Sequence, residues 1–285
     1  MKIYDCFTFY NEFDLLELRL QEHWESVDKF IIVEANKTHA GRDKEFLLEQ
    51  NWDRYKDFHD KIIHIKVDDM PVHPNAWVLE NFQRNAISRG LQQVSPEDND
   101  LIVISDVDEV IRAESFEVMR DTDYKIYSSR SPMFYFKLNY MAIEPNPYLI
   151  NSMAVRAGFK LDPQTIRNMV HRFAPLPHDY SDADSYVIQH SGWHFTYFGD
   201  SNHAANKLRN FAHQESAELA EGLDVSRLIE MRKGTNPNNP NERFEIVEVD
   251  DYFPETILKN MDRWKDFILP GAEHKISEFV PSWEE

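Results

Sequence analysis

The first part of the chain, up to about residue 112, alternates short apolar runs with segments whose apolar residues recur at helical spacing. The apolar runs predict buried strands over residues 2–9, 29–35, 61–67 and 100–105. Helical spacing predicts a helix that begins near Phe13 and includes Trp24, and a long helix over residues 75–94. Near-continuous apolar strands separated by helices are typical of an α/β protein with a mostly parallel sheet that is covered on both faces.

Two residues near the N-terminus refine this picture. Asn11 follows the first strand and has Asp14 three residues later, which predicts that Asn11 is the N-cap of the first helix. Cys6 is the single cysteine and lies among aromatic residues, so we expect a buried, inert thiol in a core strand. One cysteine cannot form an internal disulfide, which favours a reducing compartment.

The pattern changes after Ala113. Aromatic-rich runs predict strands over residues 124–128, 133–140 and 187–198, with irregular, proline-containing loops between them. Helical segments are predicted near residues 201–214 and 254–269, and composition predicts a loop over residues 234–240. No repeat or linker divides the chain, so we expect a single domain over residues 1–285, with a regular half (1–112) and a less regular half (113–285).

The formal net charge of −19 excludes one class of partner. Nucleic-acid-binding proteins need clusters of lysine and arginine, whereas this chain has 31 of these residues against 50 aspartates and glutamates. An anionic ligand therefore needs local neutralisation, by a metal or by a few placed cations. The chain has neither an apolar run of the roughly 18 residues that a membrane span requires nor a secretory signal. We expect no transmembrane segment and a cytoplasmic location.

Residues 106–109 (Asp-Val-Asp-Glu) give the strongest chemical signal. They follow the most apolar strand, and ligands of parallel sheets bind beyond the carboxyl ends of the strands. A spacing of two at a strand end points Asp106 and Asp108 in the same direction. Two converging carboxylates suit a hard divalent cation, which could also bind a substrate diphosphate. The alternative is an acidic surface turn, but adjacent carboxylates repel one another without a counter-ion.

Other polar residues are candidates for the site, and each also has a structural interpretation. His194 could complete the metal shell as a neutral imidazole, or it could form a hydrogen bond among aromatic residues. Glu215 could act as a general base, or be a solvated carboxylate at a helix end. The candidates for ligand contacts at strand ends and on the long helix are Asn11, Glu12, Glu34, Arg84 and Asn85. Arg84 could bind a diphosphate bidentately; caps, turns and surface salt bridges are the alternatives for this group.

Several longer stretches resemble a known family. They are DCFTFYNEFDLLELRL (5–20), VDKFIIVEANKTHAG (27–41), DKIIHIKVDD (60–69), ENFQRNAISRGL (80–91), DLIVISDVDEVIR (100–112), and GWHFTYFG with FAHQE (192–215). Together they resemble glycosyltransferase family 17, the family of the bisecting β-1,4-N-acetylglucosaminyltransferase of N-glycans. The resemblance covers most of the first 112 residues and one later block.

This resemblance implies a GT-A fold, in which residues 1–112 bind the nucleotide sugar and residues 113–285 shape the acceptor side. It implies transfer of N-acetylglucosamine from UDP-N-acetylglucosamine to a glycan hydroxyl, with inversion to a β-linkage and with Mn²⁺ or Mg²⁺ as cofactor. By position, Asp106 and Asp108 resemble the metal and diphosphate motif, and His194 resembles the C-terminal metal histidine. No motif identifies the catalytic base; Glu215 is the first candidate and Asp200 the alternative.

One feature of the sequence departs from the family pattern. The eukaryotic members carry a membrane anchor and a lumenal stem that this chain lacks, so a lipid-linked or polysaccharide precursor fits better as acceptor than an N-glycan.

Asp106 and Asp108 also fit the first motif of haloacid-dehalogenase-like phosphatases, with Gly199-Asp200 as the late motif. Three strand–helix segments precede this motif, and no second acidic residue follows Asp200 closely, which counts against that class. A non-catalytic carbohydrate-binding relative is the third possibility, although the metal motif is intact.

Overall fold

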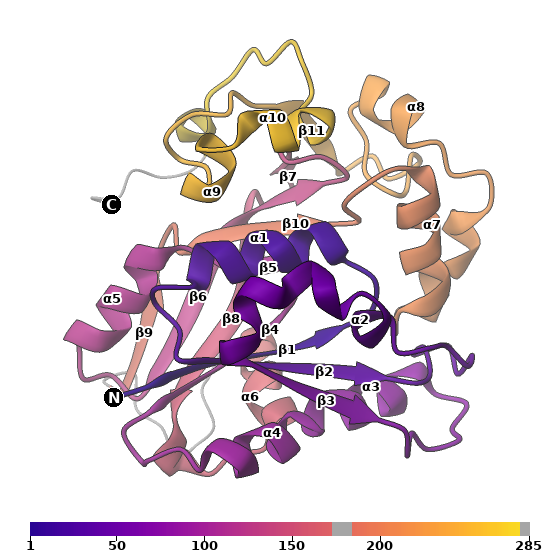
Figure 1. Ribbon diagram of the computed structural model, residues 1–285. Helices are drawn as coiled ribbons and strands as arrows, with labels where there is room; N and C mark the ends of the chain where they lie inside the picture. Colours follow the sequence, from indigo (N-terminus) through magenta and orange to yellow (C-terminus); the bar gives the residue numbers. More distant parts are fainter. Residues whose placement is uncertain (173–183, 280–285) are drawn as a thin grey trace.

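The computed structural model describes residues 1–172 and 184–279, and its N-terminal half contains the expected parallel sheet (Figure 1). The strands of this half are β1 (Ile3–Phe9), β2 (Lys29–Ala35), β3 (Ile62–Val67) and β4 (Leu101–Asp106). β1 lies between β4 and β2, and β3 pairs with the other edge of β2; all three pairings are parallel. The four predicted buried strands are confirmed, with ends that differ by one residue at most.

Helices cover both faces of these strands. α1 (Phe13–His23) lies on one face, and α3 (Ala76–Asn85) and α4 (Ile87–Val94) lie on the other (Figure 1). Because alternate residues of a strand point to opposite faces, Phe7 packs on the side of α1 whereas Cys6 packs on the side of α3 and α4. Cys6 is fully buried, as predicted, and burial raises the pKa of its thiol well above the ordinary value.

Two helix boundaries differ from the prediction. Glu12, not Asn11, occupies the N-cap position of α1, and its carboxylate turns back to accept the backbone N–H groups of Tyr10 and Asn11 at 3.1 and 3.0 Å. The long helix predicted over residues 75–94 is two helices. At Ala86 the backbone N–H bonds to the carbonyls of both Phe82 and Gln83, each at 3.1 Å, and this tighter turn separates α3 from α4.

The second half of the chain extends the sheet with antiparallel strands. β8 (Tyr148–Arg156) pairs with β4, and β6 (Ile126–Tyr135), β7 (Tyr140–Glu144) and β11 (Arg243–Ile246) follow outward. The strand order is therefore β11-β7-β6-β8-β4-β1-β2-β3. The α/β class is confirmed, and the less regular half predicted after Ala113 is the antiparallel part of the same sheet.

Strand boundaries were predicted less well in this half. The predicted strand 133–140 contains the end of β6 and the start of β7, with a turn between them. The predicted strand 187–198 is two strands, β9 (Ser185–Ile188) and β10 (Gly192–Thr196). β8 and the three-residue β5 (Glu109–Ile111) were not predicted. Polar residues interrupt the apolar pattern of β8, because its Asn151 and Ser152 are buried beside the site described below.

β10 joins the two halves at the turn that follows β4. It pairs parallel with β6 and antiparallel with β5, which places His194 opposite Glu109. Gly192 permits this approach, because a Cβ atom at that position would lie 2.1 Å from the carbonyl oxygen of Val110. The glycine in the Gly-Trp-His stretch therefore allows the backbone of β10 to lie directly against β5.

The remaining helices are short. They are α2 (Leu47–Gln50), α5 (Ala113–Asp121), α6 (Pro163–Asn168), α7 (Ser201–Asn210), α8 (Val225–Glu230), α9 (Glu255–Leu258) and α10 (Met261–Trp264), with longer 3₁₀ segments at Trp52–Lys61 and Gln214–Ala220. The helix predicted near residues 201–214 ends at Asn210, and the one near 254–269 is broken into α9, α10 and a 3₁₀ turn at Lys265–Phe267. Residues 234–240 form a loop, as predicted.

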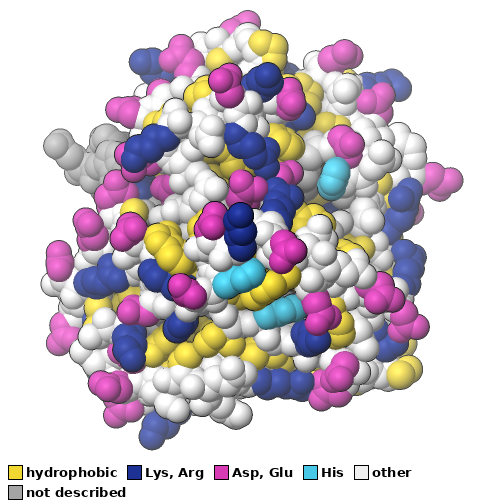
Figure 2. Space-filling view, in the orientation of Figure 1, with side chains coloured by type: hydrophobic (Ala, Val, Ile, Leu, Met, Phe, Trp, Pro, Cys, Tyr) yellow, Lys and Arg dark blue, Asp and Glu magenta, His cyan; other side chains and the backbone are white. Residues whose placement is uncertain are grey.

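Charge and hydropathy on the surface agree with the composition. On the face shown in Figure 2, lysine and arginine side chains are interspersed with the more numerous aspartates and glutamates. Within residues 1–172 and 184–279, no helix combines the length and apolar character that crossing a membrane requires.

Candidate active site

A pocket of about 670 Å³ opens beyond the carboxyl ends of β1 and β4. This is the edge at which the strand pattern predicts a ligand site. Its walls come from α3, α6, α7 and β10, so both halves of the chain contribute. Of the predicted site residues, the pocket is lined by Glu12, Arg84, Asp106, Asp108 and His194. A pocket of this volume can enclose a small-molecule ligand of the size of a nucleotide sugar.

A buried arginine holds the Asp106–Glu109 turn from behind. Arg19, on α1, donates through Nη1 to the carbonyl oxygens of Asp106 at 2.7 Å and Glu109 at 2.9 Å. Its other nitrogens bind the carboxylate of Asp5, on β1, with Nε at 2.9 Å from Oδ2. His23 lies 2.8 Å from both Asp5 Oδ2 and the carbonyl oxygen of Ile111. The turn that carries the two aspartates is thus fixed to α1 and β1 by side chains without solvent exposure.

The charge balance of this network explains why it can be buried. Burial alone would raise the pKa of Asp5, but Arg19 and His23 more than offset that effect and hold the pKa well below its ordinary value. Asp5 is therefore ionised in the folded protein and paired with a guanidinium that is also satisfied by backbone carbonyls. A buried ion pair is tolerated when its remaining hydrogen-bonding groups have partners in this way.

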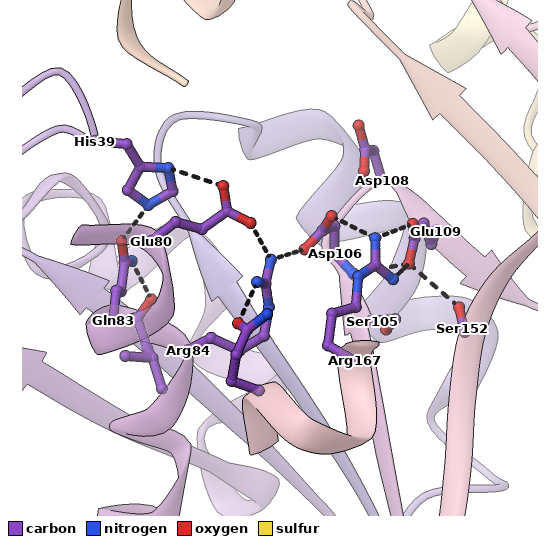
Figure 3. A network of polar contacts seen from close by, with 12 residues as sticks. His39, Glu80, Gln83, Arg84, Ser105, Asp106, Asp108, Glu109, Ser152 and Arg167 are labelled. Carbon is purple, nitrogen blue, oxygen red and sulfur yellow. Dashed lines mark hydrogen bonds and ion pairs between the residues drawn. The ribbon is translucent and has the colours of Figure 1, made fainter. Parts of the chain in front are cut away.

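In front of the turn, Asp106 is bound by two arginines (Figure 3). Its oxygens accept from Arg84 Nη2 at 3.0 Å and Arg167 Nη2 at 2.8 Å. Each arginine also binds another carboxylate, since Arg84 contacts Glu80 at 2.7 Å and Arg167 contacts both oxygens of Glu109 at 2.7 Å. Burial alone would raise the pKa of Asp106, but Arg167 and Arg84 hold it well below its ordinary value.

Asp108 has different partners and points away from the arginines (Figure 3). Its Oδ2 accepts from Lys207 Nζ, on α7, at 2.5 Å, and its Oδ1 lies 3.7 Å from Nε2 of His194, on β10. Burial alone would lower the pKa of Lys207, but Asp108 and then Glu12 raise it above the ordinary lysine value. The predicted convergence of Asp106 and Asp108 is therefore wrong as a description of their side chains, because guanidinium groups bind one and an ammonium group binds the other.

Asp108 and His194 are the two side chains of metal-ligating type that lie next to each other in the pocket. Among the described residues, no group of three or more His, Cys, Asp and Glu side chains could hold a metal by itself. One carboxylate and one imidazole nevertheless line the pocket together, and the backbone holds them there, because the N–H of Phe195 donates to the carbonyl oxygen of Asp108 at 2.8 Å. The Nδ1 atom of His194 is buried without a protein partner in the described part of the chain. Two protein donors fit a cation whose other ligands are substrate phosphates and water.

The structure places three predicted ligand-binding residues outside the pocket. Glu34 is fully buried, and its carboxylate accepts the backbone N–H of Leu48 at 3.2 Å and contacts Lys44 at 3.2 Å and His64 at 3.1 Å. A contact with a ribose or a base is therefore not available to Glu34, which instead holds the start of α2. Asn85 does not line the pocket either; its side-chain oxygen accepts the N–H of Gln164 at 2.9 Å. Asn11 lines only a small adjoining crevice together with Glu12 and Asp108.

The two candidates for the catalytic base have different surroundings. Asp200 is the N-cap of α7, accepts the N–H of His203 at 3.0 Å, and has a side chain that is 63% exposed. Glu215 is 66% exposed and also lies outside the pocket, but it contacts Nδ1 of His213 at 2.6 Å. The ring of His213 does line the pocket, where it meets Trp77 edge to face at a centroid distance of 4.5 Å.

Three charged residues that contact Asp106 or Asp108 were not predicted: Arg19, Arg167 and Lys207. Arg19 interrupts the apolar face of α1, and a buried position on that face is the signal that could have identified it. Arg167 and Lys207 lie on short helices of the second half, where neither spacing nor a motif distinguishes them from surface charges. They reach the two aspartates only because the fold places α6 and α7 at the walls of the pocket.

Comparison with known protein families identifies the family of the chain. The model of glycosyltransferase family 17 matches residues 1–236, so the chain belongs to this family. It is therefore a glycosyltransferase by family, which decides against the phosphatase alternative for Asp106 and Asp108. No protein with a curated description is similar enough in sequence to count as a relative.

One solved structure illustrates how far the similarity extends. It is the mannosyltransferase PcManGT from Pyrobaculum calidifontis, in complex with GDP-Man and Mn²⁺, at 10% sequence identity and a TM-score of 0.35. The match covers 80% of this chain and 66% of the mannosyltransferase chain.

Proposed function

We propose that this protein transfers N-acetylglucosamine from UDP-N-acetylglucosamine to a hydroxyl group of a glycan acceptor, with inversion to a β-linkage and with Mn²⁺ or Mg²⁺ as cofactor. One observation carries the proposal: in a member of family 17, the carboxylate of Asp108 and the imidazole of His194 line a single pocket at the carboxyl edge of the sheet together with five lysine and arginine side chains, Lys207 among them. In a chain of net charge −19, this is where an anionic donor finds local cations.

The reaction makes three demands on the chain. The acceptor oxygen attacks the anomeric carbon of the sugar, the bond from that carbon to the diphosphate oxygen breaks, and the acceptor proton passes to a base. UDP leaves with the electrons of the broken bond, so negative charge increases on the diphosphate. The protein must therefore neutralise the departing group, orient the sugar for attack from the opposite face, and accept one proton.

Asp108 and His194 are the residues that would hold the divalent cation. When bound, the cation supplies Lewis-acid stabilisation of the departing diphosphate. Asp106 contributes differently in this proposal, because its carboxylate holds Arg84 and Arg167 in fixed positions on the pocket wall. Glu12 also lines the pocket, as the last of the residues predicted to bind the nucleotide sugar. Its carboxylate accepts the backbone N–H of Tyr10 and so fixes the loop after β1.

For the proton acceptor we propose the His213–Glu215 pair in place of Glu215 alone. The imidazole of His213 faces the pocket, while Glu215 contacts Nδ1 and so leaves Nε2 to accept a proton. Asp200, the alternative, is occupied as the cap of α7. The pair predicts that His213→Ala lowers kcat more than Glu215→Gln does, because only the histidine touches the substrate.

The proposal is tested by a thermal-shift screen of the purified chain against UDP-, GDP- and CMP-sugars, each with and without Mn²⁺. A ligand that binds only the folded state raises Tm. We expect UDP-N-acetylglucosamine to raise Tm in the presence of Mn²⁺, and UDP release to follow when glycan acceptors are added. Stabilisation by a GDP- or CMP-sugar instead would show that the donor is not UDP-N-acetylglucosamine. Binding without transfer to any of a broad acceptor panel would favour the non-catalytic carbohydrate-binding alternative.

A further inference from the structure

Lys207 stands apart from the other cations of the pocket because its main partner is the carboxylate that would bind the metal. Its Nζ lies 2.5 Å from Asp108 Oδ2 and 5.5 Å from the ring centroid of Tyr197. α7 is attached to the N-terminal half on either side of this lysine: Asn206 accepts from the hydroxyl of Tyr10 at 2.9 Å, and Asn210 accepts from Arg42 at 3.4 Å. The backbone of α7 is therefore held beside the pocket, and only the flexible Lys207 side chain needs to move.

The arginine side of the pocket has no charge to spare for a ligand. Arg84 and Arg167 face the carboxylates of Asp106, Glu80 and Glu109, so two guanidinium groups meet three carboxylates. One negative charge remains on that side when all five groups are ionised. An incoming diphosphate therefore finds no uncompensated positive charge on the arginine side, whereas a cation bound at Asp108 would free the charge of Lys207 on the other side.

We propose that Lys207 couples the binding of the divalent cation to the binding of the donor diphosphate. In the absence of both ligands its ammonium neutralises Asp108; when the cation binds Asp108, the ammonium moves to the diphosphate and becomes a direct donor contact. This inference rests on the proposed function, since it takes the ligand of the pocket to be a nucleotide diphosphate. It adds a substrate-binding residue and a coupling between two ligands that no motif in the sequence indicates.

Elementary electrostatics gives the direction of the coupling. A divalent cation at Asp108 would lie next to the ammonium group of Lys207 and be repelled by it, so the cation alone binds weakly. A diphosphate relieves this repulsion, because it binds both positive charges. By linkage, if the nucleotide tightens cation binding by some factor, the cation tightens nucleotide binding by the same factor. The site therefore favours the cation and the nucleotide together over either alone.

The test is a titration of Mn²⁺ into nucleotide-free protein, followed by electron paramagnetic resonance of the free ion, and repeated with saturating UDP. For the unmodified chain we expect UDP to tighten Mn²⁺ binding about tenfold or more, within the usual range for coupled ligands. For Lys207→Met we expect Mn²⁺ to bind about tenfold more tightly without UDP, and the enhancement by UDP to shrink accordingly. Uridine, which lacks the diphosphate, should give no enhancement in either protein.

Lys37→Met is the matched control, because Lys37 also lines the pocket but pairs with Asp43. It should leave nucleotide-free Mn²⁺ binding within about twofold of the unmodified chain, since it removes an equal charge without a contact to Asp108. If Lys207→Met fails to fold, Lys207→Gln removes the charge and keeps an amide that can donate to Asp108. Equal Mn²⁺ affinity of the folded lysine variant and the unmodified chain would overturn the coupling. Failure of the unmodified chain to bind UDP at any Mn²⁺ concentration would instead refute the donor proposed above.

Discussion

Asp106 and Asp108 lie in one turn, two residues apart, yet their surroundings differ in almost every respect. Asp106 is bound by two guanidinium groups from α3 and α6, and each of these is fixed by a second carboxylate. Asp108 is bound by one flexible ammonium from α7 and faces an imidazole on β10. The first is part of a rigid network, whereas the second has partners that can be exchanged.

This difference teaches that a pair of acidic residues need not act as a pair. Guanidinium groups bind carboxylates in a planar, directional way, and releasing one from two carboxylates at once is costly. An ammonium on a four-carbon chain can turn to a new anion at little cost. We therefore assign positioning of the pocket wall to Asp106 and ligand binding to Asp108, and the predictions below test that division.

The largest effect should come from Asp108→Ala. We expect transfer to fall by about 1,000-fold or more, because several kcal/mol of stabilisation of the departing group would be lost. The free energy of unfolding should fall by only about 1–2 kcal/mol, since the buried Asp108 side chain loses one charged hydrogen bond to Lys207, whose side chain is 23% exposed and can turn to water. Initial rates and urea unfolding of the same preparation measure both quantities. Turnover equal to that of the unmodified chain, with Mn²⁺ present, would remove Asp108 from the site.

Arg19→Met should have the largest effect on stability. It leaves Asp5 buried without its guanidinium and frees the carbonyls of the turn, for which we expect a loss of about 3–5 kcal/mol of unfolding free energy. The double variant Asp5→Asn/Arg19→Met should recover part of this loss, because no unpaired charge remains. Urea unfolding of the three proteins measures the difference. A double variant less stable than Arg19→Met would show that the arginine does not act through Asp5.

Asp106→Asn gives the sharpest separation of the two carboxylates. If Asp106 is not a metal ligand, Mn²⁺ binding in the presence of UDP should stay within about threefold, whereas transfer should fall roughly 10- to 100-fold because the arginines lose their fixed partner. Asp108→Asn should abolish Mn²⁺ binding under the same conditions. Loss of Mn²⁺ binding in both variants would restore the two-carboxylate metal site that the sequence suggests.

The smallest predicted effect is on the stability of the folded protein at acidic pH. The pKa of Asp5 is lowered in the folded protein relative to its ordinary value of 3.8. The stability from this carboxylate is therefore fully present above that value, and is lost as the pH falls below about 4 toward the folded pKa. In urea titrations at pH 3 to 6, we expect Asp5→Asn to be less stable at pH 6 and to show a shallower loss on acidification. Identical pH slopes for the two proteins would contradict the ionised, paired state of Asp5.

Much of the fold could be predicted because the first half follows one simple rule. Strands buried on both faces, such as Lys29–Ala35, are apolar at nearly every position, and their order along the chain indicates a parallel sheet. The second half has no such rule. β8 carries buried Asn151 and Ser152, so its pattern reflects its neighbours across the sheet, which the sequence alone does not reveal.

The site was predictable in its position but not in its bonding. The Asp-Val-Asp-Glu motif and the strand before it indicate the pocket, and His194 lines the same pocket. What decides the role of each carboxylate is its partner, and Arg167 and Lys207 come from segments 61 and 99 residues away in sequence from their aspartates. Glu34 shows the opposite error: its strand-end position suggested a ligand contact, whereas its carboxylate is fully used inside the protein.

We expect the pairing of β10 with β5 to make the site a late product of folding. His194 lies opposite Glu109 across 85 residues of chain, and Lys207 lies further along still. Contacts between residues so far apart in sequence form slowly, because the long loop between them must be closed first. A nascent chain that has not yet reached residue 192 holds both aspartates and lacks the other half of their surroundings. The proposed transfer activity would therefore report that the whole sheet, and not only its parallel half, has assembled.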